Sequence, residues 1–135
     1  MVQLTQSFEF SAAHRLHVPR LSDEENRRVF GKCNNPNGHG HNYVVEVTVC
    51  GRPDPGTGCV LPLPRFEEIV KAHVIDRLDH THLNRDTKEF ADVNPSVENI
   101  AVVIWNLLRD RVSPARLSSV RVYETPKTFA EYSGE

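Results

Sequence analysis

The sequence predicts an α+β domain in which a four-stranded antiparallel sheet carries two helices on one face. Two strand-like segments come first, two helical segments follow, and a strand pair ends the chain, so the predicted order is ββααββ. The outer segments alternate apolar and polar residues, as half-buried strands do, and the middle segments repeat apolar residues at helical spacing. With 135 residues, we expect one domain spanning 1–135 that is large enough to bury a core.

The first predicted strand ends in a histidine. Its apolar face runs along alternate residues from Leu4 through Phe10 and Ala12 to His14, and polar residues occupy the other face. Residues 18–38 follow, rich in Pro, Asn and Gly, and we expect them to form a polar loop. A loop of about twenty residues in so small a domain is usually functional.

The second strand is predicted over 41–50, with alternate apolar residues from Tyr43 to Val49. An amphipathic helix is then expected to begin at Pro64, which suits a first helical turn, and to end near Leu78. The second helix is expected to carry its apolar stripe over 97–108. Either Asn94 or Ser96 would be its N-cap.

Three histidines and one thiol predict a metal site. Side chains two apart on a strand share a face, so His39 and His41 can point at one ion, and His14 offers a third nitrogen. Three nitrogen ligands leave a fourth position open, which is typical of catalytic zinc. Cys33 is either a fourth ligand that closes a structural site or a base beside an open one, and spacing alone leaves both open.

Asp79 and His80 directly follow the first predicted helix. A carboxylate beside an imidazole supplies the parts of a charge relay, in which the acid orients a proton-carrying histidine. The alternative is a solvated helix end, where the negative end of the helix dipole favours histidine.

Glu124 lies in the predicted final strand pair, over 120–125 and 128–132, in the same row as Val120 and Val122. A charge in an apolar row is costly unless it meets a partner. It is therefore either an anchor for a ligand with N–H donors or part of an edge ion pair.

Composition excludes several classes of partner. The formal net charge of −2 gives no reason to expect nucleic acid or an anionic membrane. No stretch approaches the ~20 apolar residues of a membrane span, and Met1 to Gln6 lack the features of a signal peptide. We expect a cytoplasmic protein whose three cysteines are free thiols.

These segments together resemble the 6-pyruvoyltetrahydropterin synthase family, which also includes 6-carboxytetrahydropterin synthases. The match runs in order along nearly the whole chain. Its stretches are 10–16, 21–26, 29–43, 78–84, 90–93, 98–105 and 122–125. The resemblance implies a tunnelling fold, whose subunits form trimers with the sheets closed into a barrel, and usually a homohexamer of two stacked trimers.

The resemblance also implies an activity and a role for each candidate residue. The substrate would be 7,8-dihydroneopterin triphosphate, converted to 6-pyruvoyltetrahydropterin with loss of triphosphate. Zn²⁺ would hold the side-chain hydroxyls and acidify the adjoining C–H bonds. The implied roles are zinc ligation by His14, His39 and His41, proton removal by Cys33, a proton relay by Asp79 and His80 of a neighbouring subunit, and pterin binding by Glu124.

Two other functions stay open. The 6-carboxytetrahydropterin synthases of queuosine biosynthesis share these residues and this substrate but release acetaldehyde. The loop over 33–39 favours the pyruvoyl branch and residues 94–96 the carboxy branch, and we expect the pyruvoyl product. An aldolase branch usually carries Glu in place of Cys33, which argues against it. From a different class, a non-catalytic zinc or pterin-binding module would have its metal site closed by Cys33.

Overall fold

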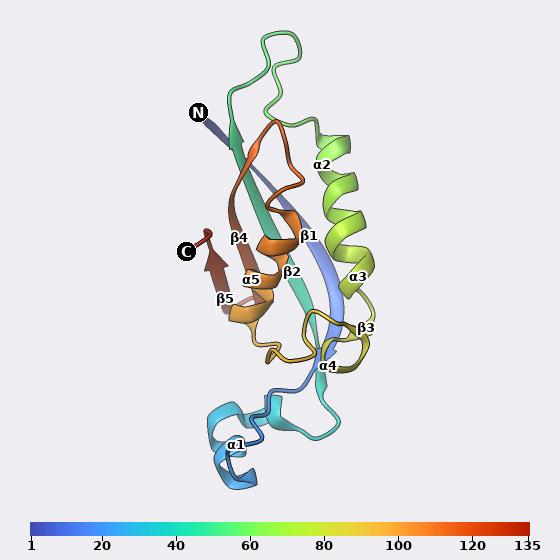
Figure 1. The fold of residues 1–135 in the computed structure, drawn as a ribbon, viewed down its shortest axis with the longest axis vertical. Coiled ribbons are helices and arrows are strands. Elements are labelled where there is room, and N and C mark those ends of the chain that lie inside the picture. The colour runs from blue at the N-terminus through green and yellow to red at the C-terminus, as the bar shows by residue number, and fades with distance from the viewer.

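A computed structural model describes residues 1–135 and has a five-stranded sheet with two helices along one face (Figure 1). The strands lie in the order β3-β1-β2-β4-β5. The elements are β1 (Val2–His14), α1 (Asp23–Phe30), a 3-10 helix (Gly31–Asn34), β2 (His39–Gly51), α2 (Leu63–Val70), a π-helical turn (Lys71–Ile75), α3 (Asp76–Leu78), β3 (Thr81–His82), α4 (Leu83–Asp86), α5 (Val97–Leu108), β4 (Arg116–Thr125) and β5 (Thr128–Tyr132).

Strands β1 and β2 form a long antiparallel pair that brings two histidines opposite each other. The register runs from Val2 opposite Gly51 to His14 opposite His39. Strand β2 therefore begins two residues before the predicted His41. The predicted alternation is confirmed, because Phe10 and Tyr43 are buried on the face that the helices cover.

The prediction of four strands was wrong. Thr81 and His82 form β3, which pairs in parallel with Ala12 and Ala13 at the edge of the sheet. A strand of two residues is too short to display an alternating pattern, so sequence periodicity could not predict it. The predicted final pair is confirmed as β4 and β5, although β4 begins at Arg116, four residues before the predicted start.

Helices α2 and α3 are joined by the π-helical turn into one run that ends at Leu78, as predicted. Along this run Phe66, Val70, Val74 and Leu78 are fully buried against the sheet. Helix α5 packs on the same face (Figure 1). No helix has the length and apolar character needed to span a membrane.

The Ser96 side chain caps α5 by accepting a hydrogen bond from the Asn99 N–H at 3.2 Å. This contact decides between the two predicted N-caps in favour of Ser96. A capping serine typically contributes about 1 kcal/mol to helix stability.

The prediction of a loop over 18–38 was also wrong, because this segment contains α1 and the 3-10 helix. Ser22 and Glu25 form a capping box at the start of α1, with hydrogen bonds of 3.0 and 3.1 Å. Asn26 is fully buried, accepts from the Val18 N–H, and donates to the Val18 carbonyl and to two others. Figure 1 shows this lobe, in blue, beyond the end of the sheet.

Candidate active site and metal centre

The predicted metal ligands meet where β1 ends and β2 begins, next to the α1 lobe. His14 and His39 face each other across the strand pair, and His41 lies opposite Ala12. One ligand atom each from His14, Cys33, His39 and His41 lies within 4.8 Å of the others. The group can therefore hold a metal ion.

The three imidazoles fit a tetrahedral metal closely. Nε2 of His39 lies 3.1 Å from Nε2 of His14 and 3.3 Å from Nε2 of His41. Two nitrogens bound to one tetrahedral zinc at about 2.0–2.1 Å lie roughly 3.3 Å apart. At these separations one cation placed between the three nitrogens could accept a lone pair from each of them.

His14 is held in the tautomer that a metal needs. Its Nδ1 lies 2.7 Å from the Pro95 carbonyl, just before α5, so Nδ1 carries the proton and Nε2 keeps its lone pair. The ring is fully buried. Burial lowers the pKa of His14 to about 4, the main opposing influence being the hydrogen bond to Pro95. Burial likewise lowers the pKa of His41.

One backbone hydrogen bond and one side-chain hydrogen bond hold the Cys33 segment beside the cluster. The Leu16 N–H donates to the Cys33 carbonyl at 2.7 Å, and the buried Asn34 donates its side-chain N–H to the Leu16 carbonyl, also at 2.7 Å. The 3-10 helix that bears the thiol is thereby tied to the chain that leaves β1. Burial, and secondly the carboxylate of Glu124, raise the pKa of the Cys33 thiol in the metal-free chain.

We expect alkylation of Cys33 by iodoacetamide to require higher pH without metal than with it. The thiolate is the charged form, so burial and a nearby carboxylate disfavour it, whereas a bound dication favours it. Adding zinc should therefore move the alkylation midpoint to lower pH. Peptide mapping would follow Cys33 with Cys59 as internal control, and an unmoved midpoint would contradict the proximity of thiol and metal.

Glu124 lies at the rim of the same cluster. Its Oε2 is 3.9 Å from Nε2 of His14, and 17% of its side chain is exposed. It sits near the end of β4, where the pairing with β5 shifts register between Tyr123 and Thr125. The carboxylate therefore points toward the helix-covered side, as its row with Val122 predicted.

The structure does not bring Asp79 and His80 into this cluster. They precede β3 at the sheet edge, where Asp79 Oδ1 accepts from the Ser11 N–H at 2.8 Å and Oδ2 lies 3.0 Å from Nδ1 of His80. The Ser11 N–H, followed by the contacts with His80, lowers the pKa of Asp79. The His80 side chain is 83% exposed, and its φ of +61° is uncommon for a non-glycine residue.

Sequence reasoning missed several residues that support the site. Asn26 and Asn34 order the lobe, and the carbonyl of Pro95 and the hydroxyl of Tyr43 contact Nδ1 of His14. Only the capping box, Ser22-x-x-Glu25, had a readable signal. A buried asparagine that bonds backbone carbonyls has no spacing that distinguishes it from an ordinary loop residue.

The fold and the site define a class: a small α+β protein with a candidate metal centre of three imidazoles and one thiol at the end of its sheet. The family model described as 6-pyruvoyl tetrahydropterin synthase matches residues 3–135. The chain therefore belongs to the 6-pyruvoyl tetrahydropterin synthase family.

Three comparisons place the chain within that family. It is 48% identical over 132 residues to the 6-pyruvoyl tetrahydrobiopterin synthase of Drosophila melanogaster, covering 97% of this chain and 79% of the relative. The solved 6-pyruvoyl tetrahydropterin synthase of Caenorhabditis elegans superposes with a TM-score of 0.92 at 41% identity, covering 99% of this chain and 96% of that one. Identity to the 6-carboxy-5,6,7,8-tetrahydropterin synthase of Rickettsia conorii is 26% over 149 residues, and the match covers 97% of this chain and 99% of the relative.

Proposed function

We propose that this protein is a zinc-dependent 6-pyruvoyltetrahydropterin synthase. It would convert 7,8-dihydroneopterin triphosphate to 6-pyruvoyltetrahydropterin and triphosphate. The observation that carries the proposal is the convergence of three imidazole nitrogens, at 3.1 and 3.3 Å, beside a thiol in a chain of this family. Three neutral imidazoles with a fourth position open are the ligand set of a catalytic zinc site, which supports that choice of metal.

Each candidate residue has a chemical role in this proposal. When bound, zinc supplies Lewis acidity that lowers the pKa of the substrate hydroxyls and the adjoining C–H bonds. Cys33 removes a carbon-bound proton as thiolate. Asp79 orients His80, which returns a proton to the opposite face of the side chain. Glu124 accepts hydrogen bonds from the N–H groups of the pterin and fixes its orientation.

We place the Asp79–His80 pair in the active site of a neighbouring subunit. Within one chain His80 is exposed at the sheet edge and apart from the thiol, so a relay on the second face of the substrate needs another copy. A homohexamer of two trimers, each closed into a barrel, supplies that copy and covers the edge strands. We further propose that residues 1–135 act as one domain, in the cytoplasm.

The pyruvoyl product is favoured over the carboxy product by sequence identity. Relatives named for the pyruvoyl activity reach 48%, whereas the carboxy relative in the comparison has 26%.

Mass spectrometry of the pterin formed from dihydroneopterin triphosphate tests the proposal. We expect 6-pyruvoyltetrahydropterin, formed only with metal. Acetaldehyde and 6-carboxytetrahydropterin would assign the chain to the other branch. If the protein releases no triphosphate in the presence of metal, it is a non-catalytic zinc or pterin-binding module.

We expect Glu124→Gln to weaken pterin binding by about 1.5–3 kcal/mol, the contribution typical of hydrogen bonds to a charged group. Thermal stability should be unchanged or higher, because the substitution keeps the shape and removes a mostly buried charge. Titration calorimetry with biopterin and a thermal melt of the same sample measure both.

Glu46→Gln is the matched control, since Glu46 lies on β2, away from the helices, and pairs with Arg121 at 3.7 Å. Its pterin affinity should equal that of the wild type. If Glu124→Gln binds pterin with unchanged affinity, Glu124 does not anchor the pterin. If the variant loses zinc, Glu124 is a metal ligand instead.

A further inference from the structure

A cavity of about 410 Å³ adjoins the metal cluster on the side of the α1 lobe. His39 lines it and is also one of the three convergent imidazoles, so the cavity and the metal site share a wall. Lys32 and Asn34, the residues on either side of Cys33, line it too. No hydrophobic residue contributes to the lining, so the cavity suits a charged ligand rather than an apolar one.

Three cationic side chains line this cavity without forming a direct ion pair. Arg15, Arg27 and Lys32 line it, and none of them forms an ion pair within the chain. The Nε of Arg15 donates to the Asn34 carbonyl at 3.2 Å, which fixes the guanidinium at the cavity wall. One carboxylate, Asp23, also lines it. Three positive charges against one negative charge leave a net charge of +2.

Unpaired cations gathered around a polar cavity repel one another and favour a polyanion. Arginine suits phosphate in particular, because its planar N–H groups can bond two oxygens at once. We infer that Arg15, Arg27 and Lys32 form a phosphate cradle that binds the triphosphate of the substrate. This inference rests on the proposed function and assigns the part of the substrate that the metal, the thiol and Glu124 do not contact.

The substrate dimensions agree with this placement. In dihydroneopterin triphosphate the phosphate ester is on the carbon next to the last hydroxyl-bearing carbon. If the metal holds the side-chain hydroxyls, the first phosphate must lie within a few bonds of the metal. The phosphate cradle meets this condition, because the cavity that it lines is also lined by His39, one of the candidate metal ligands.

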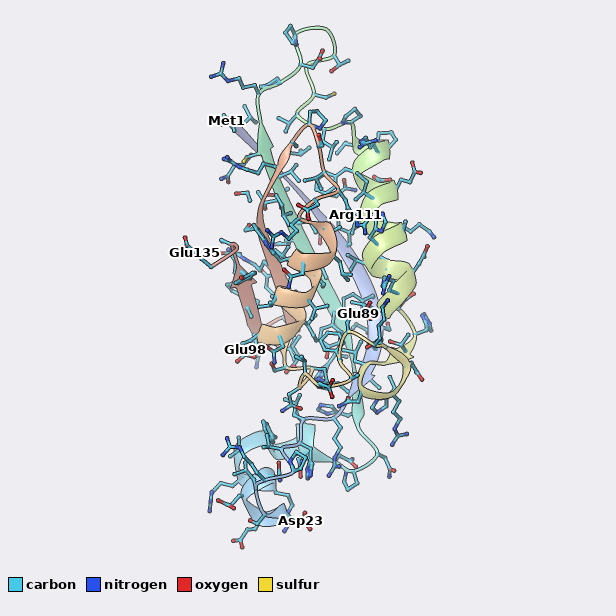
Figure 2. The ribbon with its side chains drawn as sticks, in the orientation of Figure 1. Met1, Asp23, Glu89, Glu98, Arg111 and Glu135 are labelled. Carbon is cyan, nitrogen blue, oxygen red and sulfur yellow. The ribbon has the colours of Figure 1, made fainter.

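A second cavity, of about 460 Å³, lies near the same end of the molecule but has the wrong charge. It is lined by His17, Phe90 and Asp92 among others, and contains no lysine or arginine. A carboxylate without a cation disfavours a triphosphate. In Figure 2, Asp23 marks the lobe that carries the phosphate cradle, beyond the end of the sheet and away from Glu98 at the start of α5.

The test compares neopterin triphosphate with neopterin, two fluorescent oxidised pterins that differ only in the triphosphate. On the zinc-loaded protein, the dissociation constant of neopterin divided by that of neopterin triphosphate measures what the triphosphate contributes to binding. In Arg27→Gln and in Lys32→Gln we expect this ratio to fall about tenfold, the loss typical of a hydrogen bond between charged groups, with neopterin affinity unchanged. Arg28→Gln is the matched control, because Arg28 is exposed on the same helix and does not line the cavity.

An unchanged ratio in both variants, or an equal fall in Arg28→Gln, would overturn the phosphate cradle and leave the proposed function standing. Titration with the magnesium complex of inorganic triphosphate separates the two proposals. If it binds the wild type and is lost in Arg27→Gln while neopterin does not bind at all, the phosphate cradle stands and the proposed function fails. Absence of any binding of inorganic triphosphate or neopterin triphosphate to the wild type overturns the phosphate cradle.

Discussion

Cys33→Ala is expected to lower turnover by about 10²–10⁴-fold, the contribution typical of a positioned general base. Zinc content and pterin affinity should stay at the wild-type level, because the three imidazoles converge without help from the thiol. The backbone bond between Leu16 and Cys33 does not depend on the side chain, so the lobe should remain in place. Single-turnover kinetics, elemental analysis and calorimetry of the same preparation measure the three quantities.

Cys59→Ala is the matched control, since Cys59 lies outside the metal cluster and should retain full activity. Loss of zinc from Cys33→Ala would identify the thiol as a ligand and favour the closed structural site. If Cys33→Ala turned over at the wild-type rate, Cys33 would have no part in the reaction.

His41→Ala is expected to release zinc while leaving the protein folded. The loss of affinity should exceed the roughly 10–100-fold that removal of an outer-shell partner costs. Fold retention is expected because Tyr43, Val45 and Val47 on the same strand are fully buried without the metal. Elemental analysis after dialysis measures zinc, and circular dichroism measures the fold.

His73→Ala is the control for this substitution, because His73 lies in the π-helical turn after α2 and outside the metal cluster. It should keep one zinc per site. If His41→Ala kept its zinc as well, the three-histidine site would be refuted.

The sequence predicted the parts of the fold that depend on long periodic segments. Alternation in β1 and β2 placed His14, His39 and His41 on one face, and helical spacing located the end of the α2–α3 run at Leu78. These predictions succeed because one buried face imposes its period on every residue of a long element.

The predictions that failed concern parts of the structure whose stabilising contacts do not repeat along the sequence. Strand β3 has two residues, and α1 is stabilised by a capping box and by the buried Asn26 rather than by an apolar stripe. Spacing also left the role of Cys33 open. Its position depends on hydrogen bonds made by Leu16 and Asn34, which lie on opposite sides of the lobe in sequence.

The central claim is that three imidazoles hold the metal and that the Cys33 thiol stays free to act as a base. Zinc K-edge X-ray absorption of the zinc-loaded protein tests this claim most directly, because sulfur and nitrogen ligands lie at different distances from zinc. We expect a shell of nitrogen or oxygen at about 2.0–2.1 Å and no sulfur. A sulfur at about 2.3 Å in the wild type, absent from Cys33→Ala, would make Cys33 a ligand and contradict the claim.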